Sequence, residues 1–293
     1  MAHTLNIIGP GRVGRALGAL LQRAGSCAVQ DVLSAETATA EAAVAFIGAG
    51  RAVRVLRDMR AADLWLLTPP DAAIAPVAAA LAAAGCVRKS DITFHCSGAL
   101  SSAVLAPLAA AGAKTASVHP LKSFADPAMA VQTFSGTYCA VEGDPAALAV
   151  LTPLFERLGA RVSFIDPAGK TLYHAASVLV CNDLTALMEA GLRAYEGAGI
   201  ERATAQAMME PLVRETIDNI FALGTTRALT GPVARGDAGT VAAHIAELRQ
   251  VSPQALGAYV AMARLTADRA LAAGMLRPDA AETLLDVLAE ESR

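Results

Sequence analysis

The chain has 293 residues, enough for two ordinary domains, and 54% of them are hydrophobic while only 4% are aromatic. A net charge of −3 with interspersed signs excludes a basic nucleic-acid-binding face and a polybasic membrane patch. Mean hydropathy is +0.43, but proline, glycine and polar residues interrupt the longest uncharged stretches, 72–87 and 92–113, so a soluble protein without membrane association is expected. Five cysteines without C-x-x-C spacing favour a reducing cytoplasm, and no signal peptide is expected before the first strand.

The first 166 residues alternate short apolar runs with helical patterns. Strands are predicted at 4–8, 28–33, 64–68, 92–95, 115–118, 137–141 and 162–165. Helices are predicted after the first strand with a stop at Gly25, from Ser34 as N-cap to about residue 47, after Asp71 as N-cap, and at about 101–111. This alternation predicts an α/β fold: a doubly wound, mainly parallel Rossmann sheet over residues 1–166.

The alternation of strand and helix patterns ends at Asp166–Pro167, which can start a long helix running to about residue 196. Further helices are predicted at 201–223, with a kink at Pro211, and at 240–248, 253–273 and 278–293. Residues 167–293 are therefore predicted to form an all-α domain.

The loop Gly9-Pro10-Gly11-Arg12-Val13-Gly14 follows the first strand and opens the first helix. In that context G-x-G-x-x-G predicts a dinucleotide site: Gly9 allows the turn, Gly11 admits the pyrophosphate, and Gly14 lets helix and strand pack closely. The Thr68–Pro69 turn is assigned to the same site.

The choice of cofactor depends on the end of the second predicted strand. NAD-specific sites place an acid there, but the strand ends in Ser34, with Asp31 too early in the expected register. A small hydroxyl residue admits a 2′-phosphate, and Arg12 could reach it. NADP is therefore favoured, with NAD left open.

Several motifs spread over the whole chain resemble a bacterial family of two-domain Rossmann-like oxidoreductases whose C-terminal half is a domain of unknown function. They are Gly9–Gly14, His95-Cys96-Ser97-Gly98-Ala99-Leu100, His119-Pro120-Leu121, Tyr173-His174-Ala175-Ala176 and 230–237 (TGPVARGD). More distantly the chain is similar to the 6-phosphogluconate dehydrogenase superfamily, including pyrroline-5-carboxylate and ketopantoate reductases. This resemblance implies a substrate bound between the two domains and a homodimer formed through the helical domain.

The long predicted helix departs from that superfamily's pattern, in which a catalytic lysine is followed four residues later by an asparagine. Lys170 matches the lysine, but His174 follows it and the nearest asparagine is Asn182. Lys170, His174, Ser177 and Cys181 share one helical face, so Lys170 or His174 is a candidate proton donor. The alternative is a surface lysine and a buried structural histidine; Asn182 either orients substrate or caps a polar pocket.

Three further candidates lie outside that helix. Ser97 follows a strand at the carboxyl edge of the sheet, where ligands bind, although it could equally serve helix entry. His119 ends another strand and suits acid–base chemistry, and its pairing with Pro120 resembles prephenate dehydrogenases. Arg235 could clamp a substrate carboxylate or pair with Asp237. No cluster has metal-ligand spacing, so no metal is predicted.

Together these features predict an NADP(H)-dependent oxidoreductase that reduces a small 2-oxo acid, ketopantoate being the best single guess, or a cyclic imine. Two alternatives stay open: a dinucleotide-binding sensor without catalysis, and a prephenate-type dehydrogenase.

Overall fold

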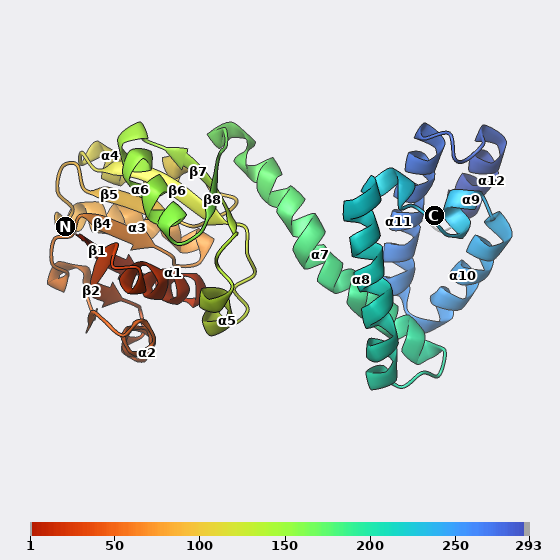
Figure 1. The fold of residues 1–293 in the computed structure, drawn as a ribbon, viewed down its shortest axis with the longest axis horizontal. Coiled ribbons are helices and arrows are strands. Elements are labelled where there is room, and N and C mark those ends of the chain that lie inside the picture. Colours follow the sequence, from red (N-terminus) through yellow and green to blue (C-terminus); the bar gives the residue numbers. More distant parts are fainter. Residues whose placement is uncertain (1, 290–293) are drawn as a thin grey trace. The chain divides into compact units, whose positions relative to one another are not determined.

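The computed structural model describes residues 2–289, which form two compact units that divide between Val178 and Leu179. The division falls inside one long helix, α7 (Lys170–Gly197), so the predicted boundary at residue 166 lies just before that helix begins. Among the described residues, all strands belong to the first unit, and the second is helical (Figure 1).

One sheet forms the centre of the first unit. Its strands are β1 (His3–Ile8), β2 (Cys27–Leu33), β3 (Arg51–Val53), β4 (Leu64–Leu67), β5 (Ile92–His95), β6 (Lys114–Pro120), β7 (Tyr138–Gly143) and β8 (Arg161–Phe164). They lie in the order β3-β2-β1-β4-β5-β6-β7-β8. Neighbours from β3 to β6 pair in parallel, β7 runs antiparallel to β6, and β8 is parallel to β7. The predicted doubly wound, mainly parallel Rossmann sheet is confirmed, and the chain order reverses between β1 and β4.

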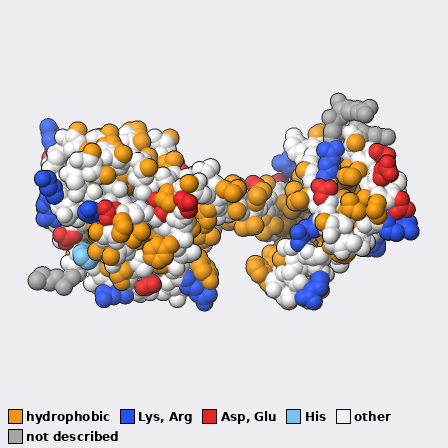
Figure 2. All heavy atoms as spheres, turned by 90° about the horizontal axis from the view of Figure 1, so that it is seen from above, with side chains coloured by type: hydrophobic (Ala, Val, Ile, Leu, Met, Phe, Trp, Pro, Cys, Tyr) orange, Lys and Arg blue, Asp and Glu red, His pale blue; other side chains and the backbone are white. Residues whose placement is uncertain are grey.

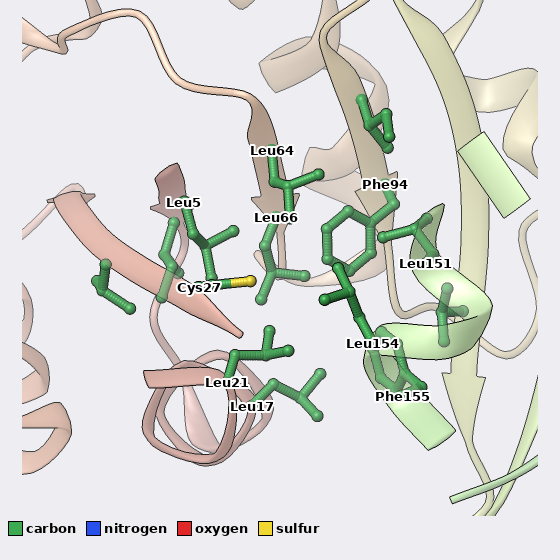
Figure 3. Close-up of a cluster of buried hydrophobic side chains, with 14 of the residues drawn as sticks. Leu5, Leu17, Leu21, Cys27, Leu64, Leu66, Phe94, Leu151, Leu154 and Phe155 are labelled. Atoms are coloured by element: carbon green, nitrogen blue, oxygen red, sulfur yellow. The ribbon is translucent and has the colours of Figure 1, made fainter. Parts of the chain in front are cut away.

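Helices cover both faces of this sheet. They are α1 (Arg12–Arg23), α2 (Thr37–Ile47), η1 (Leu56–Asp58), α3 (Asp71–Ala84), η2 (Ser102–Leu105), α4 (Ala106–Ala110), α5 (Pro127–Gln132), α6 (Pro145–Arg157) and η3 (Pro167–Gly169). On one face Leu17 of α1 and Leu154 of α6 point toward Leu66 (Figure 3). Trp65, its neighbour on β4, packs in a separate cluster with α3 and α4. Because successive strand residues point to opposite faces, a strand buried on both faces becomes apolar throughout, as β4 is.

The second unit contains the C-terminal part of α7 and a set of packed helices. These are α8 (Arg202–Arg227), α9 (Pro232–Arg235), α10 (Ala238–Val251), α11 (Pro253–Ala272) and α12 (Pro278–Ala289). Their core joins Val241 and Ile245 of α10 to alanines of α11 and to Leu284 of α12. Residues 167–197 form the one helical stretch of the described chain long and apolar enough, by length and composition, to cross a membrane.

Several predicted boundaries differ from the structure. The N-cap of α2 is Glu36 rather than Ser34, and Asp71 is the first residue of α3 rather than its cap. Pro211 lies within α8 without interrupting its dihedral angles; the interruption comes at Gly224, where φ is 80°. The helices α5 and α6 were not predicted. The short edge strand β3 was also not predicted, because it has only three residues and carries no alternating pattern.

Candidate active site

The glycine loop between β1 and α1 is held tightly against the turn after β4. Gly9 has φ of 76°, and a Cβ there would lie 2.4 Å from the nitrogen of Pro69. The Thr68 hydroxyl donates a hydrogen bond of 2.8 Å to the Gly9 carbonyl, and a Cβ on Gly14 would meet that hydroxyl oxygen at 2.4 Å. By contrast, a Cβ on Gly11 would meet nothing within 4 Å. The loop therefore leaves open space at Gly11, beside the amide donors of the first turn of α1.

A cavity of about 610 Å³ lies over the carboxyl ends of β1, β2 and β4. Its wall includes six residues predicted to bind cofactor: Gly9, Pro10, Gly11, Ser34, Thr68 and Pro69. Thr39, Arg54 and Val55 line it near the end of β2, and Pro70, Ala73 and Val77 line it on α3 and the turn before it. Its size lies in the range of cofactor sites, and its position at the reversal of strand order is where open α/β sheets bind dinucleotides.

Asp31, the acid nearest the end of β2, is fully buried and engaged elsewhere. Its carboxylate accepts hydrogen bonds from the side chains of Arg51 and Arg60 and from the Arg60 amide. Burial alone would raise the pKa of Asp31, but the hydrogen bonds from Arg60 and Arg51 outweigh it and hold the pKa below its ordinary value. The residue that follows β2 is Ser34, so no carboxylate from β2 faces the cavity.

Lys170 lies in a buried polar network under the first turn of α7. The Lys170 and Glu142 side chains are each 1% exposed, with Nζ 3.1 Å from Oε1, and Lys170 also donates to the Ser117 hydroxyl. Glu142 in turn accepts hydrogen bonds from the amide and hydroxyl of Ser102. Burial lowers the pKa of Lys170, and the Glu142 carboxylate opposes that shift. Because this ammonium contacts β6 and β7 and is shielded from solvent, the geometry favours a positioning role over contact with substrate.

Ser97 is held by hydrogen bonds at the carboxyl end of β5. Its hydroxyl donates to an Asp71 carboxylate oxygen at 2.7 Å and accepts from the amides of Ala99 and Leu100. Its own amide donates to Nδ1 of His95, which is fully buried, so the proton of His95 resides on Nε2 and is donated to the Ser101 carbonyl. The hydroxyl of Ser97 orders the segment that carries Gly98.

His119, Tyr173 and His174 meet at Gly98. Nδ1 of His119 lies 2.8 Å from the Tyr173 hydroxyl, and the His119 and His174 rings make an edge contact at 5.9 Å between centroids. A Cβ on Gly98 would lie 2.3 Å from Cδ2 of His174 and 2.8 Å from Nε2 of His119. Burial, followed by the neighbouring charge of His174, lowers the pKa of His119 to about 4. His119 is therefore a neutral imidazole at pH 7, with one nitrogen on a tyrosine and the other beside a residue without a side chain.

Three predicted residues lie outside both the cavity wall and the groups of side chains around Lys170, Ser97 and His119. Arg12 is the exposed first residue of α1, and the wall of the cavity does not include it. Asn182 is an exposed residue of α7 in the second unit, eight residues beyond His174, and Arg235 is the last residue of α9 there. Their roles stay predictions. The described residues contain no group of three or more His, Cys, Asp and Glu side chains placed to hold a metal ion.

Four residues of the candidate site were not identified as functional candidates in the sequence: Arg54 of the cavity wall, Asp71 beside Ser97, Glu142 beside Lys170 and Tyr173 beside His119. Tyr173 carried a signal, since it directly precedes His174 in one of the motifs noted in the sequence, but it was not chosen as a candidate. Arg54 and Glu142 follow from strand pairing, which brings β3 beside β2 and β7 beside β6.

Comparison with known protein families finds a match in the N-terminal part of the chain and another in its C-terminal part. Residues 2–120 match a family described as a Rossmann-like domain, and residues 137–266 match the domain of unknown function DUF2520. The second match begins one residue before β7 and therefore spans the last two strands of the sheet as well as helices of the second unit. No protein of curated function matches the sequence.

Solved structures share the fold over nearly the full chain. A Bacteroides fragilis protein assigned as an NADP oxidoreductase is 20% identical with a TM-score of 0.76, over 91% of this chain and 98% of that one. A Thermotoga maritima protein is 25% identical with a TM-score of 0.68, over 92% and 98%. An imine reductase from a Pseudomonas species is 18% identical with a TM-score of 0.65, over 98% and 100%.

Proposed function

We propose that this chain, which matches a Rossmann-like domain over residues 2–120 and DUF2520 over residues 137–266, is an NADPH-dependent oxidoreductase that reduces a small imine or carbonyl compound. One observation carries the proposal. The glycine-loop cavity and the His119–Tyr173 pair lie at the same edge of one sheet, at the carboxyl ends of β1, β2 and β4 and of β6, respectively. Ligands of open α/β sheets bind outside these strand ends.

The cavity fits a phosphorylated dinucleotide. The open face of Gly11 and the first amides of α1 suit the pyrophosphate, and Ser34 after β2 puts a small hydroxyl side chain where NAD-specific sites carry an acid. When bound, NADPH supplies the hydride. The assignment of one structural neighbour as an NADP oxidoreductase supports this choice of cofactor.

The His119–Tyr173 pair can serve the oxygen of a carbonyl substrate. When the Tyr173 hydroxyl donates to Nδ1, the proton of His119 is on Nε2, where it can be donated to the oxygen on which negative charge develops. Nε2 then gives its proton to the alkoxide while Nδ1 takes the tyrosine proton. This transfer is downhill because an alkoxide is a stronger base than a phenolate, and water restores the proton of Tyr173.

The same pair suits an imine better. A protonated imine brings its own proton, so it needs an acceptor rather than an acid. If Nδ1–H donates to the Tyr173 oxygen, Nε2 is free to accept from the iminium N–H. The low pKa of His119, about 4, keeps the ring neutral and able to accept. We therefore favour imines over 2-oxo acids such as ketopantoate, and a neighbour that is an imine reductase is consistent with this.

The test is a panel of cyclic and acyclic imines and 2-oxo acids, ketopantoate included, with NADPH and NADH as reductants and loss of nicotinamide absorbance as readout. We expect His119→Gln to lower kcat about 10²- to 10⁴-fold on carbonyl substrates, as loss of an acid–base group does, and by a smaller factor on imines, to which His119 offers a hydrogen-bond acceptor. His244→Gln is the matched control, because His244 makes the same ring contact with Tyr259 in the second unit. Equal turnover of both variants and wild type would overturn the role of His119.

The same panel separates the two alternatives. NADPH binding without turnover of any substrate would favour a dinucleotide sensor, which the departure from the lysine–asparagine pattern motivates. Oxidation of prephenate with NAD or NADP as acceptor would favour a prephenate-type dehydrogenase, in which the neutral His119 accepts the proton.

The second unit suggests a partner. Large hydrophobic side chains are exposed on α7 and α8 within this unit, among them Val180, Leu212 and Phe221 at 74%, 56% and 86% exposure. Figure 2 shows hydrophobic side chains along α7. Exposed apolar patches of this kind mark interfaces, so we propose a cytoplasmic homodimer joined through these helices. Light scattering of Phe221→Asp should then show monomer, and a wild-type monomer would exclude the dimer.

A further inference from the structure

The proposed function leaves open which residue recognises the 2′-phosphate that distinguishes NADPH from NADH. The candidates for this recognition are the polar residues of the cavity wall near the end of β2, which are Ser34, Thr39 and Arg54. Of the described residues that line the cavity, Arg54 is the one that carries a charge.

Strand pairing explains why Arg54 is beside Ser34. β2 and β3 are parallel, and Leu33, the last residue of β2, pairs with Val53, the last residue of β3. The next residues, Ser34 and Arg54, therefore leave the sheet side by side, one strand spacing of about 4.8 Å apart. The dinucleotide-binding position that reads the ribose hydroxyls is the end of β2. Arg54 occupies the neighbouring strand end, twenty residues away in sequence.

Arg54 is also available, in contrast to the arginines around it. Arg51 and Arg60 both contact the buried carboxylate of Asp31, at 3.1 and 2.7 Å, and donate further to the carbonyls of Asp58 and Gln30. In the described part of the chain, no hydrogen bond or ion pair is recorded for the exposed side chain of Arg54. A guanidinium without a protein partner on a cavity wall is suited to a phosphate, which it can bind with two parallel hydrogen bonds.

Resting on the proposed function, we infer that Arg54 binds the 2′-phosphate of the cofactor and sets the preference for NADPH over NADH. Ser34 supplies its hydroxyl group to the same phosphate. Arg12, at the start of α1, lies beside the pyrophosphate loop, so it serves both cofactors alike. Glu36 follows Ser34 by two residues, and its carboxylate accepts a hydrogen bond from the hydroxyl of the lining residue Thr39 at 3.4 Å.

Direct binding tests this without any substrate. Dissociation constants of NADP⁺ and NAD⁺, which differ only in the 2′-phosphate, are measured by calorimetry for wild type, Arg54→Ala, Arg54→Lys, Arg12→Ala and the control Arg57→Ala. Arg57 is an exposed arginine of η1 that is not part of the cavity wall. Arg54→Ala should weaken NADP⁺ about 10- to 100-fold, the loss of a charged hydrogen bond, and leave NAD⁺ within about twofold. Arg54→Lys should recover part of the loss, and Arg57→Ala should change neither.

The possible failures are distinguishable. If wild type binds both dinucleotides but Arg54→Ala weakens both equally or neither, the inference is wrong and the proposed function stands. Tighter binding of NAD⁺ than NADP⁺, abolished by Glu36→Gln, would assign that end of the cavity to a ribose diol and overturn the inference. If wild type binds neither dinucleotide, the proposed function fails and the inference fails with it. Because Arg54 is exposed and makes no hydrogen bond or ion pair with residues 2–289, its variants should retain the wild-type melting temperature, which thermal unfolding checks.

Discussion

Replacing Lys170 by Met tests whether the lysine is a structural anchor of α7 rather than a group that meets substrate. Methionine keeps the volume and flexibility of the side chain but removes its charge and its hydrogen bonds. Glu142 would then be left buried, with Ser102 as its remaining partner. Because the side chains of Lys170 and Glu142 are both 1% exposed, water does not readily replace the lost ammonium.

The expected magnitude follows from that burial. Removing one partner of a buried ion pair destabilises a protein by about 3–5 kcal/mol, since an uncompensated charge remains. For a unit of this size each kcal/mol lowers Tm by about 2–4 °C, so Lys170→Met should melt about 6–20 °C below wild type. Lys114→Met is the control: Lys114 pairs with Asp144 in a partly exposed position, and its loss should cost less than about 1 kcal/mol.

The assay is chemical and thermal unfolding of Lys170→Met, Glu142→Gln and the double variant. The side-chain amide introduced by Glu142→Gln can still accept from Ser102 and carries no charge. The double variant should therefore recover part of the stability lost in Lys170→Met, giving a coupling energy above about 1 kcal/mol. NADP⁺ affinity should not change, because neither residue lines the cavity. A Lys170→Met protein as stable as the Lys114→Met control would refute the burial argument.

Three further predictions concern Gly98, the tyrosine of the site and the buried histidines. Gly98→Ala should lower kcat at least about tenfold because its Cβ would displace His119 and His174; Gly257→Ala in α11, where nothing lies within 4 Å, should leave kcat unchanged. Tyr173→Phe should lower kcat with unchanged NADP⁺ affinity, while the control Tyr259→Phe should leave kcat unchanged. Equal kcat in both variants would show that the Tyr173 hydroxyl takes no part in the reaction. Burial lowers the pKa of both His95 and His119 from 6.5 to about 4. The unfolded chain therefore takes up these protons first on acidification, and stability is retained above about pH 6.5 and lost toward pH 4, by up to about 3 kcal/mol for each histidine. Urea unfolding across this range should show a shallower decline for His119→Gln, and an identical decline would contradict a lowered pKa for His119.

The predicted cofactor-binding part of the site could be identified from the sequence because the residues that indicate it are close together in the chain. Gly9, Gly11 and Gly14 fall within six residues, and their roles depend on the adjacent strand and helix. Hydrophobic periodicity predicted most of the strands and helices for the same reason: each pattern is set by residues that are neighbours in the chain. These features determined the fold class and the edge of the sheet at which a ligand is predicted to bind.

The rest depended on contacts between distant residues. Lys170 donates hydrogen bonds to Glu142 and Ser117, and Tyr173 contacts His119, only because the start of α7 packs on β6 and β7. The antiparallel course of β7 and the position of β3 beside β2 place Glu142 and Arg54 where no spacing rule predicts them. Side-chain type and helical periodicity made Lys170 a catalytic candidate; its burial, which only the tertiary structure determines, favours the role of an anchor. The sequence by itself determined that this protein has a Rossmann sheet with a G-x-G-x-x-G loop after its first strand, and tertiary packing decided which charged and titratable groups remain available for chemistry.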